Sequence, residues 1–291
     1  MTVEETISTA SAMTWSLRGR SLSLETRTRV MGILNVTPDS FSDGGRFLAP
    51  ADAVRAGRRM IDQGADILDI GGESTRPGAC EISIREELRR VLPAIEGLRE
   101  VGDIPLSVDT RHAEVASKAV AAGADIINDV SALRHDPAMA EVAVSTGAGL
   151  VLMHMRGRPE SMQRHPRYRN VVQEVRDFLA ERVEAAIAAG IRKDALVVDP
   201  GIGFGKTVEH NVDLLADLDE LIGMRRPVLI GVSRKSFLGA LTGRGPDERL
   251  AAGIAAQAFA VLRGARILRV HDVKETCDAL KILDMLRRRR T

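Results

Sequence analysis

Short apolar segments recur along the chain from residue 30 onward, separated by longer segments whose apolar residues recur every three or four positions. Short segments with so little charge are typical of strands buried on both faces of a parallel sheet. Spacing by three and four is the helix period. The eight short segments span residues 30–36, 66–70, 104–108, 125–127, 150–153, 196–198, 228–232 and 266–270.

Eight strand and helix units in succession predict a closed (β/α)8 TIM barrel. Glycines follow several of the helical segments, at Gly64, Gly123, Gly147, Gly190 and Gly264, where a left-handed cap ends a helix. An open doubly wound sheet is the alternative, but it normally has fewer strands and a glycine fingerprint after the first one, which is absent here.

The segment before the barrel, residues 15–24, alternates apolar and polar residues about Gly19. This pattern predicts a short β-hairpin that could plug one end of the barrel. We expect a disordered tail at residues 1–13 and a single barrel domain over residues 14–291. The first residues contain acids and no basic region, so they do not resemble a secretory signal.

In a (β/α)8 barrel the catalytic face lies at the carboxyl ends of the strands, so the residues at those ends carry the information about function. Every predicted strand ends in a side chain that can form hydrogen bonds or carry charge, which favours a single functional mouth. These residues are Asn35, Asp69 with Glu73, Asp109, Asn128 with Asp129, His154, Asp199, Ser233 with Lys235, and Arg269 with His271.

Two loops after the first two strands are rich in glycine and hydroxyl groups, at residues 35–45 and 71–78. Such loops commonly form walls or lids of ligand sites. The alternative for the first loop is an ordinary surface turn.

Side chains of the last and first strands suit a phosphate or diphosphate, because these strands are neighbours in a closed barrel. The guanidinium of Arg269 matches phosphate oxygens, and the Asn35 carbonyl can bind Mg²⁺. The alternative for His271 is a residue at a helix N-terminus.

Asp109, Asn128 and Asp199 can pair with the donor and acceptor edge of a fused aminopyrimidine ring. For Asp199 the alternative is the first residue of a turn.

The segment GIGFGKT, residues 201–207, ends like a phosphate-binding P-loop. The P-loop pattern requires glycine where Pro200 stands, so the match fails. We predict instead a glycine-rich loop that positions Phe204 over a ligand plane.

Lys235 follows the seventh strand and is predicted to lie beside the floor of the site, although surface lysines are common. No residue pattern indicates a nucleophile for covalent catalysis.

Composition narrows the class of protein. Of the 291 residues 44% are hydrophobic and 28% charged, with a net charge of +1, which argues against a nucleic-acid-coating or membrane-coating protein. No apolar run approaches the roughly 20 residues that span a bilayer. The two cysteines have no metal-site or disulfide spacing, which favours a reducing, cytoplasmic location.

Eight motifs, in this order along the chain, together resemble the dihydropteroate synthase family from residue 15 onward. They are NVTPDSFSDGG, GGESTRPG, SVDT, INDVSA, LMHM, DPGIGFGK, GVSRKSFLG and RVHDV. Any one of them could arise by chance, whereas the ordered set is specific.

The resemblance implies a transferase of folate biosynthesis that joins 6-hydroxymethyl-7,8-dihydropterin diphosphate to 4-aminobenzoate, requires Mg²⁺ and is a target of sulfonamides. It implies a homodimer, with Asp109, Lys235 and Asp43 in catalysis. The implied pterin residues are Asp109, Asn128, Val130, Met153, Asp199 and Lys235. The implied diphosphate residues are Asn35, Arg269 and His271, with Asn35 also binding the metal. The implied aminobenzoate residues are Thr75, Arg76, Pro77, Phe204 and Ser236.

One position departs from the family pattern. Ile202 stands where many relatives carry a second phenylalanine, which puts the packing around aminobenzoate in doubt. Two rival functions remain at this point. A pterin-binding methyltransferase on the same barrel is expected to lack the ESTRPG and SRKS segments, both present here. A non-catalytic relative would bind a pterin without turnover.

Overall fold

The computed structural model describes residues 13–37, 50–74, 79–159 and 161–289. Its strands form a two-stranded antiparallel sheet near the N-terminus and an eight-stranded sheet. The strands are β1 Thr14–Leu17, β2 Arg20–Ser23, β3 Arg29–Asn35, β4 Ile67–Gly71, β5 Leu106–Asp109, β6 Ile126–Asp129, β7 Gly149–Met153, β8 Leu196–Asp199, β9 Leu229–Ile230 and β10 Ile267–Val270.

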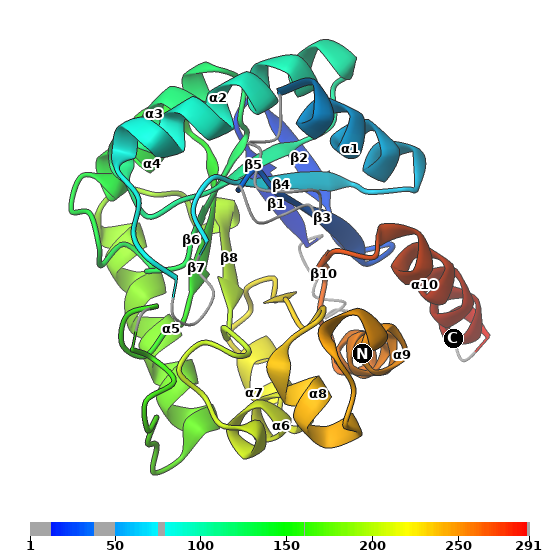
Figure 1. Ribbon diagram of the computed structural model, residues 1–291. Helices are drawn as coiled ribbons and strands as arrows, with labels where there is room; N and C mark the ends of the chain where they lie inside the picture. The colour runs from blue at the N-terminus through cyan, green and yellow to red at the C-terminus, as the bar shows by residue number, and fades with distance from the viewer. Residues whose placement is uncertain (1–12, 38–49, 75–78, 160, 290–291) are drawn as a thin grey trace, which may run out of the picture.

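The larger sheet is parallel throughout, in the order β8-β7-β6-β5-β4-β3-β10-β9. It closes where Val198 of β8 bridges Val228, just before β9, and the Val198 amide donates to the Pro227 carbonyl at 3.0 Å. The predicted (β/α)8 barrel is therefore confirmed, and Figure 1 shows its strands at the centre of a ring of helices.

The helices cover the outer face of the barrel because each carries one apolar face that packs on the strands. The five predicted cap glycines all have positive φ, as expected for helix ends. Among the described residues no helix is both long and apolar enough to cross a bilayer. The helices are α1 Pro50–Asp62, α2 Ile84–Val101, α3 Ala113–Ala121, α4 Met139–Thr146, α5 Val171–Ala188, α6 Val208–Ala216, α7 Asp219–Ile222, α8 Ser236–Thr242, α9 Leu250–Leu262 and α10 Val273–Arg288.

The N-terminal hairpin β1–β2 closes the end of the barrel where the strands begin, as predicted. Trp15 is fully buried, and its indole Nε1 donates to the Ala195 carbonyl, one residue before β8, at 2.9 Å. The first residue of β7 is Gly149, and a Cβ there would lie 3.0 Å from the Trp15 ring nitrogen. The hairpin thus seals the amino ends of the strands and leaves the carboxyl ends for a site.

The strand bounds differ from the predicted ones at two places that matter for the site. Asn128 and Asp129 belong to β6 rather than following it. The predicted strand at residues 228–232 has only two residues in ladder form, Leu229–Ile230. Asp69 lies inside β4, as the predicted segment 66–70 had it, and its side chain is completely buried.

Candidate active site

A buried ion-pair triad lies at the carboxyl ends of β4, β5 and β10. The Arg269 Nε donates to Asp69 Oδ2 at 2.6 Å, and its NH2 donates to Asp109 Oδ2 at 2.6 Å. These contacts join residues that lie 200 and 160 positions apart in the sequence. The guanidinium of Arg269 lies between these two carboxylates, and its predicted orientation toward Asn35 stays a prediction.

One cation faces two carboxylates in this triad, which leaves one excess negative charge in a site shielded from water. Burial raises the pKa of Asp109 to about 7, with Asp69 adding to the rise and Arg269 opposing it. For Arg269, burial lowers the pKa, but Asp69 and Asp109 outweigh it and the pKa rises above its ordinary value. Asp109 therefore takes up a proton near neutral pH while Arg269 stays charged.

Each carboxylate of the triad keeps one oxygen available for a ligand. The Oδ1 atoms of Asp69 and Asp109 are buried and have no hydrogen-bond partner among the described residues. Buried polar atoms are normally hydrogen-bonded, so unsatisfied ones mark positions where a ligand or a bound water supplies the partner.

Asn35 lies beside the triad because Gly71 pairs in register with Asn35 of β3 on one side and with Asp109 of β5 on the other. A Cβ at Gly71 would lie 3.6 Å from the Asp109 Cβ and 3.7 Å from the Asn35 Oδ1. The amide oxygen of Asn35 and the free Asp109 oxygen are hard donors of the kind that Mg²⁺ prefers. The donor set fits the predicted metal.

Asn128 and Asp199 extend the polar surface along β6 and β8. Asn128 donates its Nδ2 to Asp69 Oδ2 at 3.2 Å, which ties it to the triad. Asp199 ends β8, is buried, and accepts the Gly201 amide at 2.7 Å. Burial raises the pKa of Asp199, while this hydrogen bond and the charge of Lys235 oppose the rise. The turn interpretation of Asp199 is therefore also correct.

An apolar wall adjoins the polar groups. It is a buried cluster made of Val130, Met153, Met155, Met162 and Phe204. Lys235 places its Nζ 4.1 Å from the centre of the Phe204 ring, in cation–π contact. Two residues predicted for different substrates, Lys235 and Phe204, are thus direct neighbours, and Ser236 begins α8 next to them.

The glycine-rich loop after β8 is held by hydrogen bonds to its backbone. Buried Lys206 donates its Nζ to the carbonyls of Gly201 and Phe204 at 2.9 and 3.0 Å, and its Nζ lies 2.9 Å from His154 Nδ1. Burial lowers the pKa of Lys206 to about 7 and that of His154 to about 2. Ile202 is buried in the main core rather than in the apolar wall.

Some strand-end residues do not face the mouth as expected. His154 packs edge to face on Phe178 of α5, with ring centroids 4.9 Å apart, so it lies behind the wall. Asp129 accepts hydrogen bonds from the Ser131 and Leu133 amides and serves a turn. Glu73 pairs with Arg111. The prediction that the strand-end side chains all face one mouth is therefore wrong for His154, Asp129 and Glu73.

The side chain of His271 belongs to the mouth rather than only to a helix end. Its Nδ1 lies 3.1 Å from the Ser233 Oγ, and this hydroxyl also accepts the His271 amide at 3.2 Å. Ser233 follows β9, so the pair joins β9 to β10 at the rim. The predicted site residues Asp43, Thr75, Arg76 and Pro77 lie outside the described residues.

Two residues important for this arrangement were not assigned roles from the sequence. Asp69 was noted only as a strand-end residue, and its role depends on the distant Arg269. Lys206 was considered only as part of a failed P-loop match. The sequence signal for both was present: a charged residue inside a strongly apolar or glycine-rich segment is buried only with partners.

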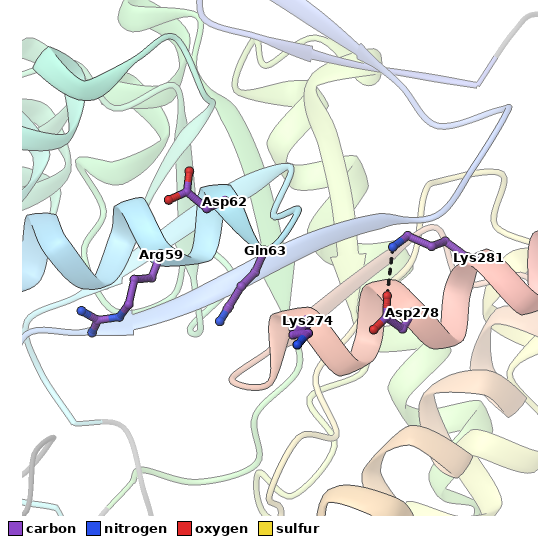
Figure 2. A pocket seen from close by; sticks show the side chains of 6 residues that line it. All are labelled: Arg59, Asp62, Gln63, Lys274, Asp278 and Lys281. Atoms are coloured by element: carbon purple, nitrogen blue, oxygen red, sulfur yellow. Dashed lines mark hydrogen bonds and ion pairs between the residues drawn. The ribbon is translucent and has the colours of Figure 1, made fainter.

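A separate hollow of about 510 Å³ lies outside the barrel between α1 and α10 (Figure 2). In Figure 2 Asp278 pairs with Lys281, and the other charged side chains point away from one another. None of its residues belongs to the strand-end site. They are Arg59, Asp62, Gln63, Lys274, Asp278 and Lys281.

A closed barrel with carboxylates, an amide and an apolar wall at its strand ends defines a pterin-binding enzyme, and residues 31–271 match the family described as pterin binding enzyme. The chain is 47% identical to the dihydropteroate synthase of Escherichia coli (strain K12) over 267 residues, 92% of this chain and 94% of the relative.

Two solved structures resemble the chain over nearly its whole length. The Xanthomonas albilineans dihydropteroate synthase with 4-aminobenzoic acid has a TM-score of 0.90 and 50% identity, covering 95% of this chain and 99% of that chain. The Yersinia pestis dihydropteroate synthase in a sulfonamide drug complex has a TM-score of 0.90 and 46% identity, covering 95% and 100%. The chain belongs to the dihydropteroate synthase family and is a transferase.

Proposed function

We propose that the mouth formed by the Asp69–Arg269–Asp109 triad, Asn128 and Asp199 binds 6-hydroxymethyl-7,8-dihydropterin diphosphate and joins it to 4-aminobenzoate. The products are 7,8-dihydropteroate and diphosphate. The observation that carries this proposal is the triad itself, because it puts acceptors with free oxygens and a permanent cation within one buried site.

The pterin ring lies between the polar strand ends and the apolar wall in this proposal. Asp199 accepts from adjacent N–H groups of the ring, and Asn128 offers both a donor and an acceptor. Asp109 can present either a protonated or an ionised oxygen, since its pKa is about 7. Val130 and Met153 contact the ring face, and Lys235 donates to a ring oxygen or nitrogen.

The diphosphate lies nearer to Asn35, Arg269 and His271. Arg269 keeps its charge, so it attracts an anion without a change of protonation. Asn35 would hold Mg²⁺ through its Oδ1, and the bound ion would neutralise part of the diphosphate charge. His271 is oriented for this contact by Ser233.

The aminobenzoate lies against Phe204, Ser236 and the Lys235 ammonium, together with Thr75, Arg76 and Pro77 of the second loop. The family resemblance also assigns Asp43 of the first loop to catalysis, and this residue lies outside the described part of the chain. Phe204 is held by Lys206 through its carbonyl, so its ring has a fixed position for stacking on the aromatic ring of aminobenzoate.

The reaction proceeds by cleavage of the bond between the pterin methylene carbon and the diphosphate oxygen, and the electron pair leaves with diphosphate. The electron-rich pterin and the nearby Asp109 carboxylate stabilise the positive charge on carbon. The neutral amine of aminobenzoate then forms the new carbon–nitrogen bond. An aromatic ammonium loses its proton readily to water, so no strong base is required.

The test is diphosphate release by the purified chain with both substrates and Mg²⁺. We expect release that depends on 4-aminobenzoate and is reduced at least about 100-fold in Lys235→Ala and Asp199→Asn. The control is Lys118→Ala, whose ammonium is exposed and pairs with Glu114 on the same helix. Pterin binding without release, or wild-type rates in both site variants, would overturn the proposal.

We also propose that the chain is a cytoplasmic homodimer that pairs through the outer faces of α9 and α10. These faces expose the large apolar side chains Leu262, Phe259, Ile282, Met285 and Leu286. Exposed apolar patches mark interaction sites. Sedimentation at micromolar concentration tests the homodimer, and a monomer at that concentration would contradict it.

Both cysteines are free, as expected in a reducing compartment.

A further inference from the structure

A cluster of imidazole and carboxylate groups lies beside the mouth and has no part in the proposed reaction. Glu81 precedes α2, His112 precedes α3 and His135 precedes α4. Each of them offers one ligand atom, and the three atoms lie within 4.8 Å of one another. The Glu81 Oε1 is 3.7 Å from the His112 Nε2, and the two imidazole rings meet edge to face with centroids 5.0 Å apart.

The His112 ring is oriented from behind by a buried carboxylate. Its Nδ1 lies 2.8 Å from the Oε2 of Glu87, which is completely buried. An ionised carboxylate only accepts hydrogen bonds, so Nδ1 carries a proton and, in the neutral ring, Nε2 holds the lone pair. That lone pair is on the side of Glu81. A carboxylate behind an imidazole is the arrangement that fixes the tautomer of metal-binding histidines and strengthens them as ligands.

The other two ligands are accessible from solvent. His135 is exposed as a residue. The Glu81 side chain is 51% exposed and can rotate toward the two rings. An ion can therefore enter from the outside without any change in the barrel.

The charges around the cluster also suit a divalent cation. Glu73 and Glu81 both pair with the guanidinium of Arg111, and Glu87 pairs with His112. These three carboxylates outnumber the one guanidinium in these ion pairs. Arg111 contacts Glu81 at 3.1 Å and Glu73 at 3.3 Å, so it retains Glu73 as a partner when Glu81 turns to a metal ion.

We propose that Glu81, His112 and His135 form a binding site for a late first-row transition-metal ion, with Zn²⁺ the ion that fits best. Two imidazole nitrogens and one carboxylate oxygen are a common zinc ligand set, whereas Mg²⁺ prefers oxygen ligands alone. Ligand distances of about 2.0–2.1 Å require the three atoms to draw together, which rotation of the exposed Glu81 and His135 side chains would allow. The fourth position is open to water. This ion is separate from the Mg²⁺ proposed at Asn35.

The test is a titration of chelator-treated protein with Zn²⁺ in competition with a chromophoric zinc indicator, in buffer containing millimolar Mg²⁺. We expect one Zn²⁺ per chain, not displaced by Mg²⁺, and at least tenfold weaker binding in both His135→Ala and Glu81→Gln. Both changes are at exposed positions, so the variants fold. The control is His165→Ala, at an exposed turn outside the cluster.

Two results would overturn the proposal: no saturable binding by the wild type, or wild-type affinity in His135→Ala and Glu81→Gln. Anomalous scattering at the zinc edge provides an independent readout. A peak between His112 and His135 supports the proposal, and a peak at Asn35 or elsewhere contradicts it. None of these outcomes depends on turnover, so they are distinct from a failure of the proposed synthase activity.

Discussion

Replacement of Gly201 by alanine tests how the glycine-rich loop is held against the end of β7. Gly201 has φ +66, and a Cβ there would lie 1.9 Å from the carbonyl oxygen of His154. Gly147 has the same φ of +66, but a Cβ there would meet nothing within 4 Å. Gly147→Ala is therefore a matched control that carries the same backbone strain without the collision.

The expected loss of unfolding free energy has two contributions, backbone strain and lost hydrogen bonds. Alanine in the left-handed region costs about 1–2 kcal/mol at either position. At Gly201 the loop must also shift by more than an ångström. That shift disturbs the hydrogen bonds from its amide to Asp199 and from Lys206 to its carbonyl. Each buried group left unsatisfied costs about 1–3 kcal/mol, so strain and two such groups together are expected to cost Gly201→Ala about 3–8 kcal/mol of unfolding free energy.

The assay is urea unfolding followed by circular dichroism for the wild type and both variants. We expect the Gly201→Ala midpoint to lie well below that of Gly147→Ala, with similar slopes. Because the loop carries Phe204, we also expect the KM for 4-aminobenzoate to rise in Gly201→Ala only. A difference of less than about 1 kcal/mol between the two variants would refute the close approach of this loop to His154.

Three further predictions concern the triad and the hairpin. Arg269→Met leaves Asp69 and Asp109 buried without a cation, so we expect a loss of about 3 kcal/mol in urea unfolding and at least about 100-fold slower diphosphate release. Asp109 holds a proton in the folded chain up to a pKa of about 7 against 3.8 ordinarily, so wild-type stability falls as pH rises from 4 to 7. Asp109→Asn lacks this decline, and the two stability curves diverge by up to about 4 kcal/mol over that range. Trp15→Ala removes a fully buried indole, so we expect a loss of about 3–5 kcal/mol in urea unfolding with unchanged KM values.

Each of these predictions has a clear opposite outcome. A stable and active Arg269→Met chain would mean that the triad is not the centre of the site. Parallel pH curves for wild type and Asp109→Asn would mean that Asp109 is ionised throughout. A changed KM in Trp15→Ala would mean that the hairpin acts on the mouth from the opposite end of the barrel.

The barrel was predictable because its evidence is local. Each strand is a short apolar run and each helix has its own period, and closure follows from their number. β9 was predicted too long because residues 228–232 are uniformly apolar, whereas ladder pairing stops at Ile230. Apolar character alone does not say how many residues pair.

The triad was only partly predictable because it depends on contacts across the barrel. The sequence places Asp69, Asp109 and Arg269 near strand ends, but whether Arg269 turns toward Asn35 or toward Asp69 depends on which side chains point inward at each strand. Asp69 and Arg269 face the barrel interior because alternate residues of a strand point inward, and their side chains meet there. A shift of either strand by one residue would turn these side chains to the outer face of the barrel.

The support of the glycine-rich loop was not predictable from its motif. GIGFGKT looked like a failed phosphate loop, and His154 looked like another residue of the mouth. Lys206 instead contacts His154 and the carbonyls of its own loop, which requires the ends of β7 and β8 to lie side by side. A lysine surrounded by acceptors is recognised only when those acceptors are brought together by the fold.

The most direct test of the central claim is a crystal structure of the chain with 7,8-dihydropteroate. The account predicts the pterin edge within about 2.7–3.2 Å of Asp199 and Asp109, its ring face on Met153 and the benzoate ring beside Phe204. A pterin bound elsewhere, or one with no hydrogen bond to these carboxylates, would contradict the claim that the strand ends form the active site.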